Sequence, residues 1–214
     1  MTDLTGNTFF DGPAGPIEAI IKEPGGPVTR AAIVCHPHPL FGGTMHNKVV
    51  FRIARAFQNA GFAVLRFNFR GAGQSAGEHD NGIGEQGDLR AAIKFIQERY
   101  TEAEIWLAGF SFGSMVMILG AGGNPEIRAF VAVGVPVLKY DFTETTLGNK
   151  PKLFIQGSLD EFGPPQELER FFATLDEPKE MQIIRGADHF FEGRLNELGE
   201  AVSKFIDKVN SRQP

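Results

Sequence analysis

The chain has 214 residues, a net charge of −5 and a hydrophobic fraction of 42%. This length suffices for one filled core and is short for two, so we expect a single domain over residues 1–214. The composition is that of a folded globular chain, and the negative charge argues against a nucleic-acid-binding surface. No apolar run approaches the roughly 20 residues that span a bilayer, which argues against a membrane protein.

The start of the chain, "MTDLTGNTFFDG", lacks the basic residues and the apolar core of a signal peptide. We therefore expect a cytoplasmic location. Cys35 is the only cysteine, which excludes an internal disulfide and a cysteine cluster for zinc. It lies in the apolar run "AAIVC", and we expect it to be buried in the core.

The elements begin with "GNTFFDGPAGPIEAIIKE", where two apolar-rich runs flank the turn residues Asp11-Gly12-Pro13 and predict an antiparallel hairpin. Short runs rich in Val, Ile, Leu and Phe follow, and several are nearly continuous, which is typical of parallel strands covered on both faces. These runs are "AAIVCHPH", "FAVLRFNFR", "EIWLAGFS", "RAFVAVGVP", "KLFIQG" and "MQIIRGA".

Segments with helical spacing lie between or after these predicted strands. They are "HNKVVFRIARAFQNAG", "EQGDLRAAIKFIQERY", "PPQELERFFATL" and "GRLNELGEAVSKFIDKVN". Alternating strands and helices predict the α/β class, with a doubly wound, mostly parallel sheet that carries helices on both faces.

The stretch "LAGFSFGSM" joins a predicted strand directly to a helix, with Ser111 at the junction. In the pattern G-x-S-x-G, Gly109 and Gly113 remove side chains that would collide in a sharp turn, so the serine hydroxyl projects above the sheet. The helix that follows directs unpaired N–H groups toward the place where negative charge develops in acyl transfer. So short a pattern also occurs by chance, and the partners of the serine therefore decide its meaning.

Suitable partners follow in the order serine, acid, histidine. Asp160 lies in the loop after the strand "KLFIQG", and His189 lies in the loop after "MQIIRGA". All three residues fall beyond the carboxyl ends of strands, where open parallel sheets place their sites. We predict a catalytic triad of Ser111, His189 and Asp160.

Other carboxylates are weaker candidates for the acid. Glu161 is adjacent to Asp160, but a strand-end loop normally offers one side chain in the required direction. Asp188 precedes His189 directly, and we expect it to cap or brace its loop. Asp88 is expected to be an early helical residue that complements the helix dipole.

Acyl transfer also needs N–H donors for the oxyanion, normally the residue after the nucleophile and one from the loop after an earlier strand. The first would be Phe112. In "CHPHPLFGGTMHN", Pro37 and Pro39 have no N–H. The remaining donors are those of His38, Leu40, Phe41 and the glycines. We favour Leu40, because prolines stiffen the chain before it and Gly42-Gly43 allow a tight turn after it.

The histidines of this stretch could also bind a metal, since His36 and His38 form an H-x-H pair and His46 is close. No carboxylate or cysteine lies within the stretch, so we interpret the imidazoles as hydrogen-bonding braces and predict no metal. The glycine-rich "FRGAGQSAG" lacks the ending of a P-loop and the dinucleotide pattern. We therefore predict no cofactor.

The order of the elements, with "GFSFG", "GSLDEFGP" and "GADHFF", resembles the α/β-hydrolase fold over nearly the whole chain. More narrowly, "HPHPLFGGTMHNKVV" and "NFRGAGQSAG" resemble small bacterial serine hydrolases similar to dienelactone hydrolase. The resemblance implies the same triad of Ser111, Asp160 and His189 and the oxyanion donors Leu40 and Phe112. Dienelactone hydrolases themselves use cysteine as the nucleophile, so their lactone substrate does not transfer. The elbow also lacks the aspartate of epoxide hydrolases and haloalkane dehalogenases.

We expect a serine hydrolase that cleaves small or short-acyl carboxylic esters through an acyl-enzyme. Only a short segment separates "VAVGVPV" from "PKLFIQG", which leaves no room for a large cap domain over the site. Phenylalanines beside the motifs could line a pocket or fill the core: Phe41, Phe110, Phe112, Phe162, Phe190 and Phe191.

Alternative functions keep the triad but change the scissile bond to a thioester, an amide, a peptide or a carbon-carbon bond, or transfer the acyl group to an acceptor other than water. A binding protein of the same fold without turnover is a further alternative. We expect a small-molecule ester as partner, no nucleic acid, no membrane, and a monomer or homodimer.

Overall fold

A mixed eight-stranded sheet with the order β1-β2-β4-β3-β5-β6-β7-β8 forms the centre of the computed structural model, which describes residues 6–143 and 145–211. The strands are β1 (Gly6–Gly12), β2 (Gly15–Lys22), β3 (Arg30–Cys35), β4 (Ala63–Phe67), β5 (Glu104–Phe110), β6 (Ile127–Val133), β7 (Lys152–Gly157) and β8 (Lys179–Ile184). β1 and β2 form the antiparallel hairpin, and β4, β3, β5, β6, β7 and β8 run parallel. The predicted fold class is confirmed.

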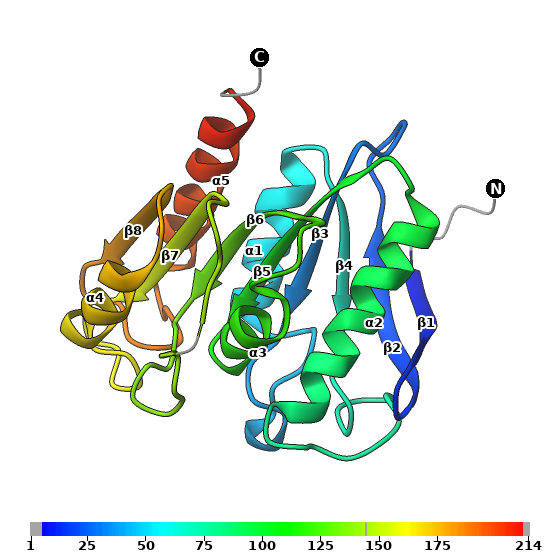
Figure 1. Cartoon of the computed structure of the whole chain (residues 1–214), viewed down its shortest axis with the longest axis horizontal. Coiled ribbons are helices and arrows are strands. Elements are labelled where there is room, and N and C mark those ends of the chain that lie inside the picture. The colour runs from blue at the N-terminus through cyan, green and yellow to red at the C-terminus, as the bar shows by residue number, and fades with distance from the viewer. Residues whose placement is uncertain (1–5, 144, 212–214) are drawn as a thin grey trace.

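Helices cover both faces of this sheet (Figure 1). α1 (Lys48–Asn59) and α5 (Leu195–Asn210) pack on one face, and α2 (Ile83–Arg99), α3 (Phe112–Ala121) and α4 (Pro165–Thr174) lie on the other. Each layer of helices buries one of two apolar clusters against the sheet. Because β3, β5 and β6 are covered on both sides, their residues are almost entirely buried, as the continuous apolar runs predict.

α1 illustrates how local sequence determines an element here. The side chain of Asn47 caps its first turn by accepting hydrogen bonds from the N–H groups of Val49 and Val50. Its apolar stripe is buried, and Gly61, with φ of 80°, takes the chain into β4. The capped, amphipathic helix holds the end of the β3–α1 loop (residues 36–47) in place.

The connection between β6 and β7 differs from the other parallel connections. In its described residues, 134–143 and 145–151, it forms no helix or strand. The edge of the sheet where the parallel strands end therefore carries only loops and a short 3-10 turn, η1 (Pro39–Phe41). The expectation that no large cap domain covers this edge agrees with that arrangement.

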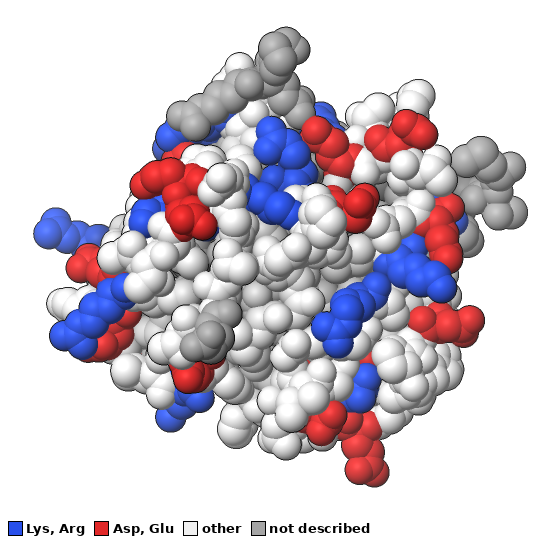
Figure 2. All heavy atoms as spheres, viewed as in Figure 1, with Lys and Arg blue, Asp and Glu red and all other residues white. Residues whose placement is uncertain are grey.

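Charged side chains of both signs lie interspersed on the face covered by α2, α3 and α4, around a large uncharged area over α3 (Figure 2). None of the helices in the described part of the chain is both long enough and apolar enough to span a bilayer.

Candidate active site

Ser111 occupies a strained turn between β5 and α3. Its φ of 54° and ψ of −121° lie outside the regions that side chains normally favour. A Cβ on Gly109 would lie 2.4 Å from the carbonyl oxygen of Gly113, and a Cβ on Gly113 would lie 2.5 Å from that of His36. The two glycines are therefore required by the close approach of backbone, as the G-x-S-x-G pattern predicts. The Ser111 N–H donates to the carbonyl of Val133 (2.9 Å) and anchors the turn to β6.

The structure brings Ser111, His189 and Asp160 into one hydrogen-bonded chain. His189 Nε2 lies 2.8 Å from Ser111 Oγ, and His189 Nδ1 lies 2.8 Å from Asp160 Oδ2. Because a carboxylate accepts at Nδ1, that nitrogen carries the proton, and Nε2 is free to accept the serine proton. The imidazole is 4% exposed, and its ring packs 4.7 Å from the ring of Phe162. The arrangement suits removal of a proton from the serine.

The carboxylate of Asp160 is held by donors on both oxygens. Oδ1 accepts from the N–H groups of Phe162 (2.9 Å) and Gly163 (3.1 Å), and Oδ2 accepts from Gln156 Nε2 (2.9 Å) as well as from His189. All of these groups donate, so together they fix the orientation of the carboxylate.

Gln156 is a site residue that sequence analysis missed. Its side chain is fully buried, and its Oε1 accepts from the N–H of Val135 while Nε2 donates to Asp160 and to the carbonyl of Gly163. The signal was present, since Gln156 is the one polar side chain at the end of the apolar run "LFIQG". It ties the loop after β7 to the segment after β6.

The competing carboxylates lie elsewhere. Glu161 is exposed, and Asp188 Oδ1 accepts from the N–H of Glu192 (3.1 Å), which braces the loop as expected. Asp88 was expected to interact favourably with the helix dipole. The structure shows that it is fully buried and forms an ion pair with Arg70 (2.7 Å). It thus fixes the loop after β4 to α2.

The N–H groups of the β3–α1 loop differ in their partners. Leu40 N–H points to His38 Nδ1 (3.3 Å), Phe41 and Gly43 donate to the carbonyl of His38 (3.1 Å each), and Gly42 donates to that of Pro39 (3.1 Å). Within the described residues, the N–H of His38 has no acceptor. η1 therefore uses the N–H of Leu40 inside the turn and leaves that of His38 free.

Phe112, the other predicted donor, opens α3 directly after Ser111, and the described residues supply no acceptor for its N–H. Free N–H groups are expected in the first turn of a helix. The backbone of Phe112 is thus available beside the serine, whereas Leu40 is 70% exposed and outside the cavity lining described below.

The histidines of the loop have separate surroundings. His36 is fully buried, donates from Nδ1 to the carbonyl of Pro37 (2.6 Å) and accepts at Nε2 from Phe69 N–H (2.9 Å). Burial lowers the pKa of His36 to about 4, so it is a neutral brace at neutral pH. His46 is exposed. Among the residues that the structure describes, no His, Cys, Asp or Glu side chains form a group able to hold a metal.

His79 and Glu85 form a second cluster that sequence analysis missed. His79 Nδ1 lies 2.8 Å from Glu85 Oε1, and the His79 ring packs 4.6 Å from that of His38. Glu85 is fully buried and accepts from the N–H groups of Asp80 and Gly82 (2.9 Å each). Burial, followed by the charge of His79, lowers the pKa of His38, and Glu85 opposes this shift. The loop after β4 thus supports the β3–α1 loop.

A cavity of about 600 Å³ opens beside Ser111. Its aromatic lining consists of Phe41, Phe112, Tyr140, Phe162 and Phe190. Its polar side chains are those of His38, Asn47, Ser111, Lys139 and His189. The remaining phenylalanines beside the motifs, Phe110 and Phe191, are fully buried in the core. A mostly apolar cavity with a few convergent polar groups is the usual form of a small-molecule site.

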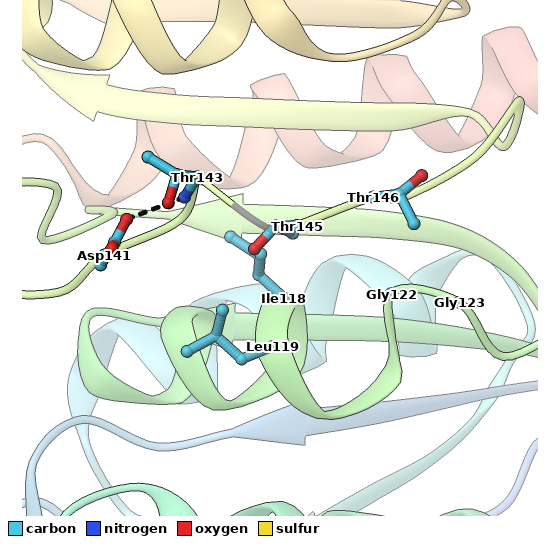
Figure 3. Close-up of a pocket in the computed structure, with 8 residues that line it drawn as sticks. All are labelled: Ile118, Leu119, Gly122, Gly123, Asp141, Thr143, Thr145 and Thr146. Carbon is cyan, nitrogen blue, oxygen red and sulfur yellow. Dashed lines mark hydrogen bonds between the residues drawn. The ribbon is translucent and has the colours of Figure 1, made fainter.

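A smaller hollow of about 260 Å³ lies between α3 and the segment before β7 (Figure 3). Ile118 of α3 points toward Thr145 across it, and Thr146 lies near Gly122. Asp141 supplies the one carboxylate among the described residues that line it, and this carboxylate accepts from the N–H of Thr143 (2.9 Å) in its own loop. The described residues of this hollow include no nucleophile with a neighbouring base, and the cavity beside Ser111 is the candidate active site.

Comparison with known proteins shows the family of the chain. Residues 34–149 match a family model described as alpha/beta hydrolase fold. The chain is similar to an uncharacterized protein of Rickettsia prowazekii, with 35% identity over 95% of this chain and 89% of that protein. Among solved structures, a serine hydrolase homologue from Coxiella burnetii is 38% identical over 95% of this chain and 98% of its own, with a TM-score of 0.89. A serine hydrolase without a lid from Xanthomonas campestris is 34% identical over 100% of this chain and 99% of its own, with a TM-score of 0.92.

Proposed function

Because the chain belongs to the α/β-hydrolase family, we propose that it is a serine esterase that cleaves small or short-acyl carboxylic esters. The family supports hydrolase activity in general. The observation that carries the narrower proposal is the chain of two 2.8 Å contacts from Ser111 through His189 to Asp160. A serine with a positioned base, and a base oriented by a buried carboxylate, is the arrangement that nucleophilic acyl transfer requires.

The proposed reaction has two steps. Ser111 Oγ attacks the ester carbonyl while His189 Nε2 takes the serine proton, and Asp160 stabilises the imidazolium. His189 then gives the proton to the departing alcohol, which leaves an acyl group on Ser111. Water enters, loses a proton to His189 and attacks the acyl-enzyme, and the acid leaves as the proton returns to Ser111.

The oxyanion formed in each step needs donors that are not already bonded. The N–H of Phe112 meets this condition at the start of α3. Among the candidate donors from His38 to Gly43, the free N–H belongs to His38, because that of Leu40 points to the His38 imidazole and those of Phe41, Gly42 and Gly43 donate within the turn. We therefore assign the second donor to His38 in place of Leu40.

The open cavity favours small substrates. Phe41 and Phe190 line it and are 85% and 57% exposed, so its mouth is open to solvent. An unlidded cavity of about 600 Å³ excludes water less completely than a buried channel, which suits short acyl groups more than long ones.

The test is the initial rate of hydrolysis of p-nitrophenyl esters from acetate to laurate, by the wild type and Ser111→Ala. We expect the highest kcat/KM with short chains, and a fall of at least ~10⁴-fold in kcat in the variant. Labelling of Ser111 by a fluorophosphonate would establish the nucleophile separately. Absence of Ser111-dependent turnover on every ester would contradict the esterase and favour another scissile bond or a binding protein.

A further inference from the structure

The lining of the cavity carries a positive charge and no negative one among its described residues. Among the described residues that line it, Lys139 carries the only permanent charge, and none is an aspartate or glutamate. The whole chain has a net charge of −5, so the sign inside the cavity is opposite to that of the protein. A cavity of one sign with apolar walls raises the local concentration of ligands of the opposite sign.

Lys139 is placed close to the reacting groups by the backbone. The N–H of Leu138 donates to the carbonyl of Phe162 (3.2 Å), and the N–H of Lys139 donates to that of Pro136 (2.9 Å). Lys139 Nζ lies 5.9 Å from the centre of the Phe162 ring, which itself lies 4.7 Å from the ring of His189. One aromatic side chain therefore separates the ammonium from the proposed catalytic base.

Lys139 and its neighbour Tyr140 contact the protein through aromatic packing, on Phe162 and Phe112 respectively, and not through their polar groups. Over residues 6–143 and 145–211, no carboxylate pairs with Lys139 Nζ and no acceptor lies at the hydroxyl of Tyr140. Burial, and to a smaller extent the charge of Glu85, raises the pKa of Tyr140, so its hydroxyl keeps its proton and can donate. Two adjacent residues that line the cavity thus carry donors with no hydrogen-bond acceptor among the described residues.

We propose that Lys139, assisted by the hydroxyl of Tyr140, selects esters that carry a carboxylate or a similar anion a few bonds from the scissile carbonyl. This inference rests on the proposed esterase function and names its substrate class. The anion would lie at the mouth, against the ammonium, while the apolar part of the substrate contacts Phe162 and the other rings.

The experiment compares matched anionic and neutral esters. 4-Acetoxybenzoate and 4-acetoxybenzamide place the charge on the alcohol side, and p-nitrophenyl hydrogen adipate and p-nitrophenyl hexanoate place it on the acyl side. The readout is the selectivity ratio, the kcat/KM of the anionic ester divided by that of its neutral counterpart. A lysine with only a structural role would change both members of a pair alike and leave this ratio constant.

In at least one pair we expect Lys139→Glu to lower the ratio about tenfold and Lys139→Gln about threefold, as for a partly exposed charge pair. Lys139→Arg should restore it to within about twofold of the wild type, and added salt should shrink the differences. Lys204→Glu, at an exposed position of α5 outside the cavity lining, makes the same change of net charge and should leave the ratio unaltered.

A ratio that stays within about twofold in Lys139→Glu for both pairs overturns the proposal and leaves the esterase function standing. If no ester shows Ser111-dependent turnover, the proposed function fails, and binding decides the inference instead. NMR titration of Ser111→Ala with 4-hydroxybenzoate and 4-hydroxybenzamide should then show tighter binding of the anion, lost in Lys139→Glu. Equal binding of the two ligands would overturn it.

Discussion

Ser111, after β5, lies between two groups of loops that differ in their construction. The loops after β7 and β8 are on one side of it, and the loop after β3 is on the other. On the first side, Asp160 and His189 are 2% and 4% exposed, and each oxygen of the carboxylate has two donors. On the second side, Leu40 and Phe41 are 70% and 85% exposed, and η1 is held mainly by its own backbone hydrogen bonds.

This difference separates two tasks. A proton transfer between serine and histidine tolerates little variation in distance, so the groups that perform it are fixed by buried hydrogen bonds. Substrate entry requires exposed apolar surface and room, which the loop after β3 supplies. In the proposed mechanism the same loop also supplies the free N–H of His38 to the oxyanion. Four substitutions, each with a matched control variant, test how far the separation holds.

The largest effect is expected from Asp160→Asn. All four groups around the carboxylate donate, so an asparagine must turn its NH₂ toward two donors whichever way it is placed. Gln156 cannot adapt without releasing the N–H of Val135. We expect kcat to fall by ~10³–10⁴-fold, because His189 loses the tautomer that accepts the serine proton. Rates with p-nitrophenyl butyrate measure this.

Glu161→Gln is the matched control, since it changes the neighbouring carboxylate, which is exposed. It should leave kcat within about twofold of the wild type. If the two variants were equally impaired, Asp160 would not be the orienting acid. Thermal unfolding of both variants shows whether the loss of activity reflects a loss of fold.

The next effect concerns the backbone of the loop after β3. His38→Pro removes the N–H, and the φ of −55° at this position suits proline, whereas His38→Ala removes only the imidazole. We expect kcat/KM of His38→Pro to lie about 100-fold below that of His38→Ala, the value of one oxyanion donor. Equal values for the two variants would return the donor role to another N–H of the loop.

The fold and much of the candidate site could be predicted from the sequence because they depend on local patterns and their order. The continuous apolar runs became the parallel strands, and the glycines around Ser111 and the order of Asp160 and His189 placed these three residues together. The choice between Leu40 and His38 could not be made in this way. It depends on which N–H groups the turn of η1 uses internally, and the prolines that define this turn do not reveal it.

Contacts between distant segments were also beyond sequence reasoning. His79 reaches His38 from the loop after β4, and Gln156 joins the segment after β6 to the loop after β7. No spacing rule connects residues of such different elements. Gln156 was visible as an isolated polar side chain in an apolar strand, but its partners were not.

A smaller effect, on stability, is expected from His36, the buried brace at the base of the loop. Its pKa falls from 6.5 to about 4 on folding, so below pH 6.5 the unfolded chain binds a proton that the folded chain does not. The free energy of unfolding therefore falls by about 3 kcal/mol in total as the pH is lowered from above 6.5 toward 4. Urea unfolding across this range should show a shallower loss in His36→Gln, and an unchanged loss in His46→Gln, where the histidine is exposed. An identical pH dependence in wild type and His36→Gln would contradict the assignment.

The smallest effect is a difference in KM between substitutions of two adjacent exposed residues of the same turn. Phe41 lines the cavity and Leu40 does not, although both side chains are mostly in solvent. Phe41→Ala should raise KM by about two- to fivefold for p-nitrophenyl octanoate, because the acyl chain loses up to about 1 kcal/mol of apolar contact. The acetate offers this ring little apolar chain to contact and should keep its KM, and Leu40→Ala should leave both values unchanged. If Leu40→Ala affected the octanoate as much as Phe41→Ala did, the exposed side of the site would act as a general apolar surface, and the division between a fixed catalytic side and a selective substrate side would need a different boundary.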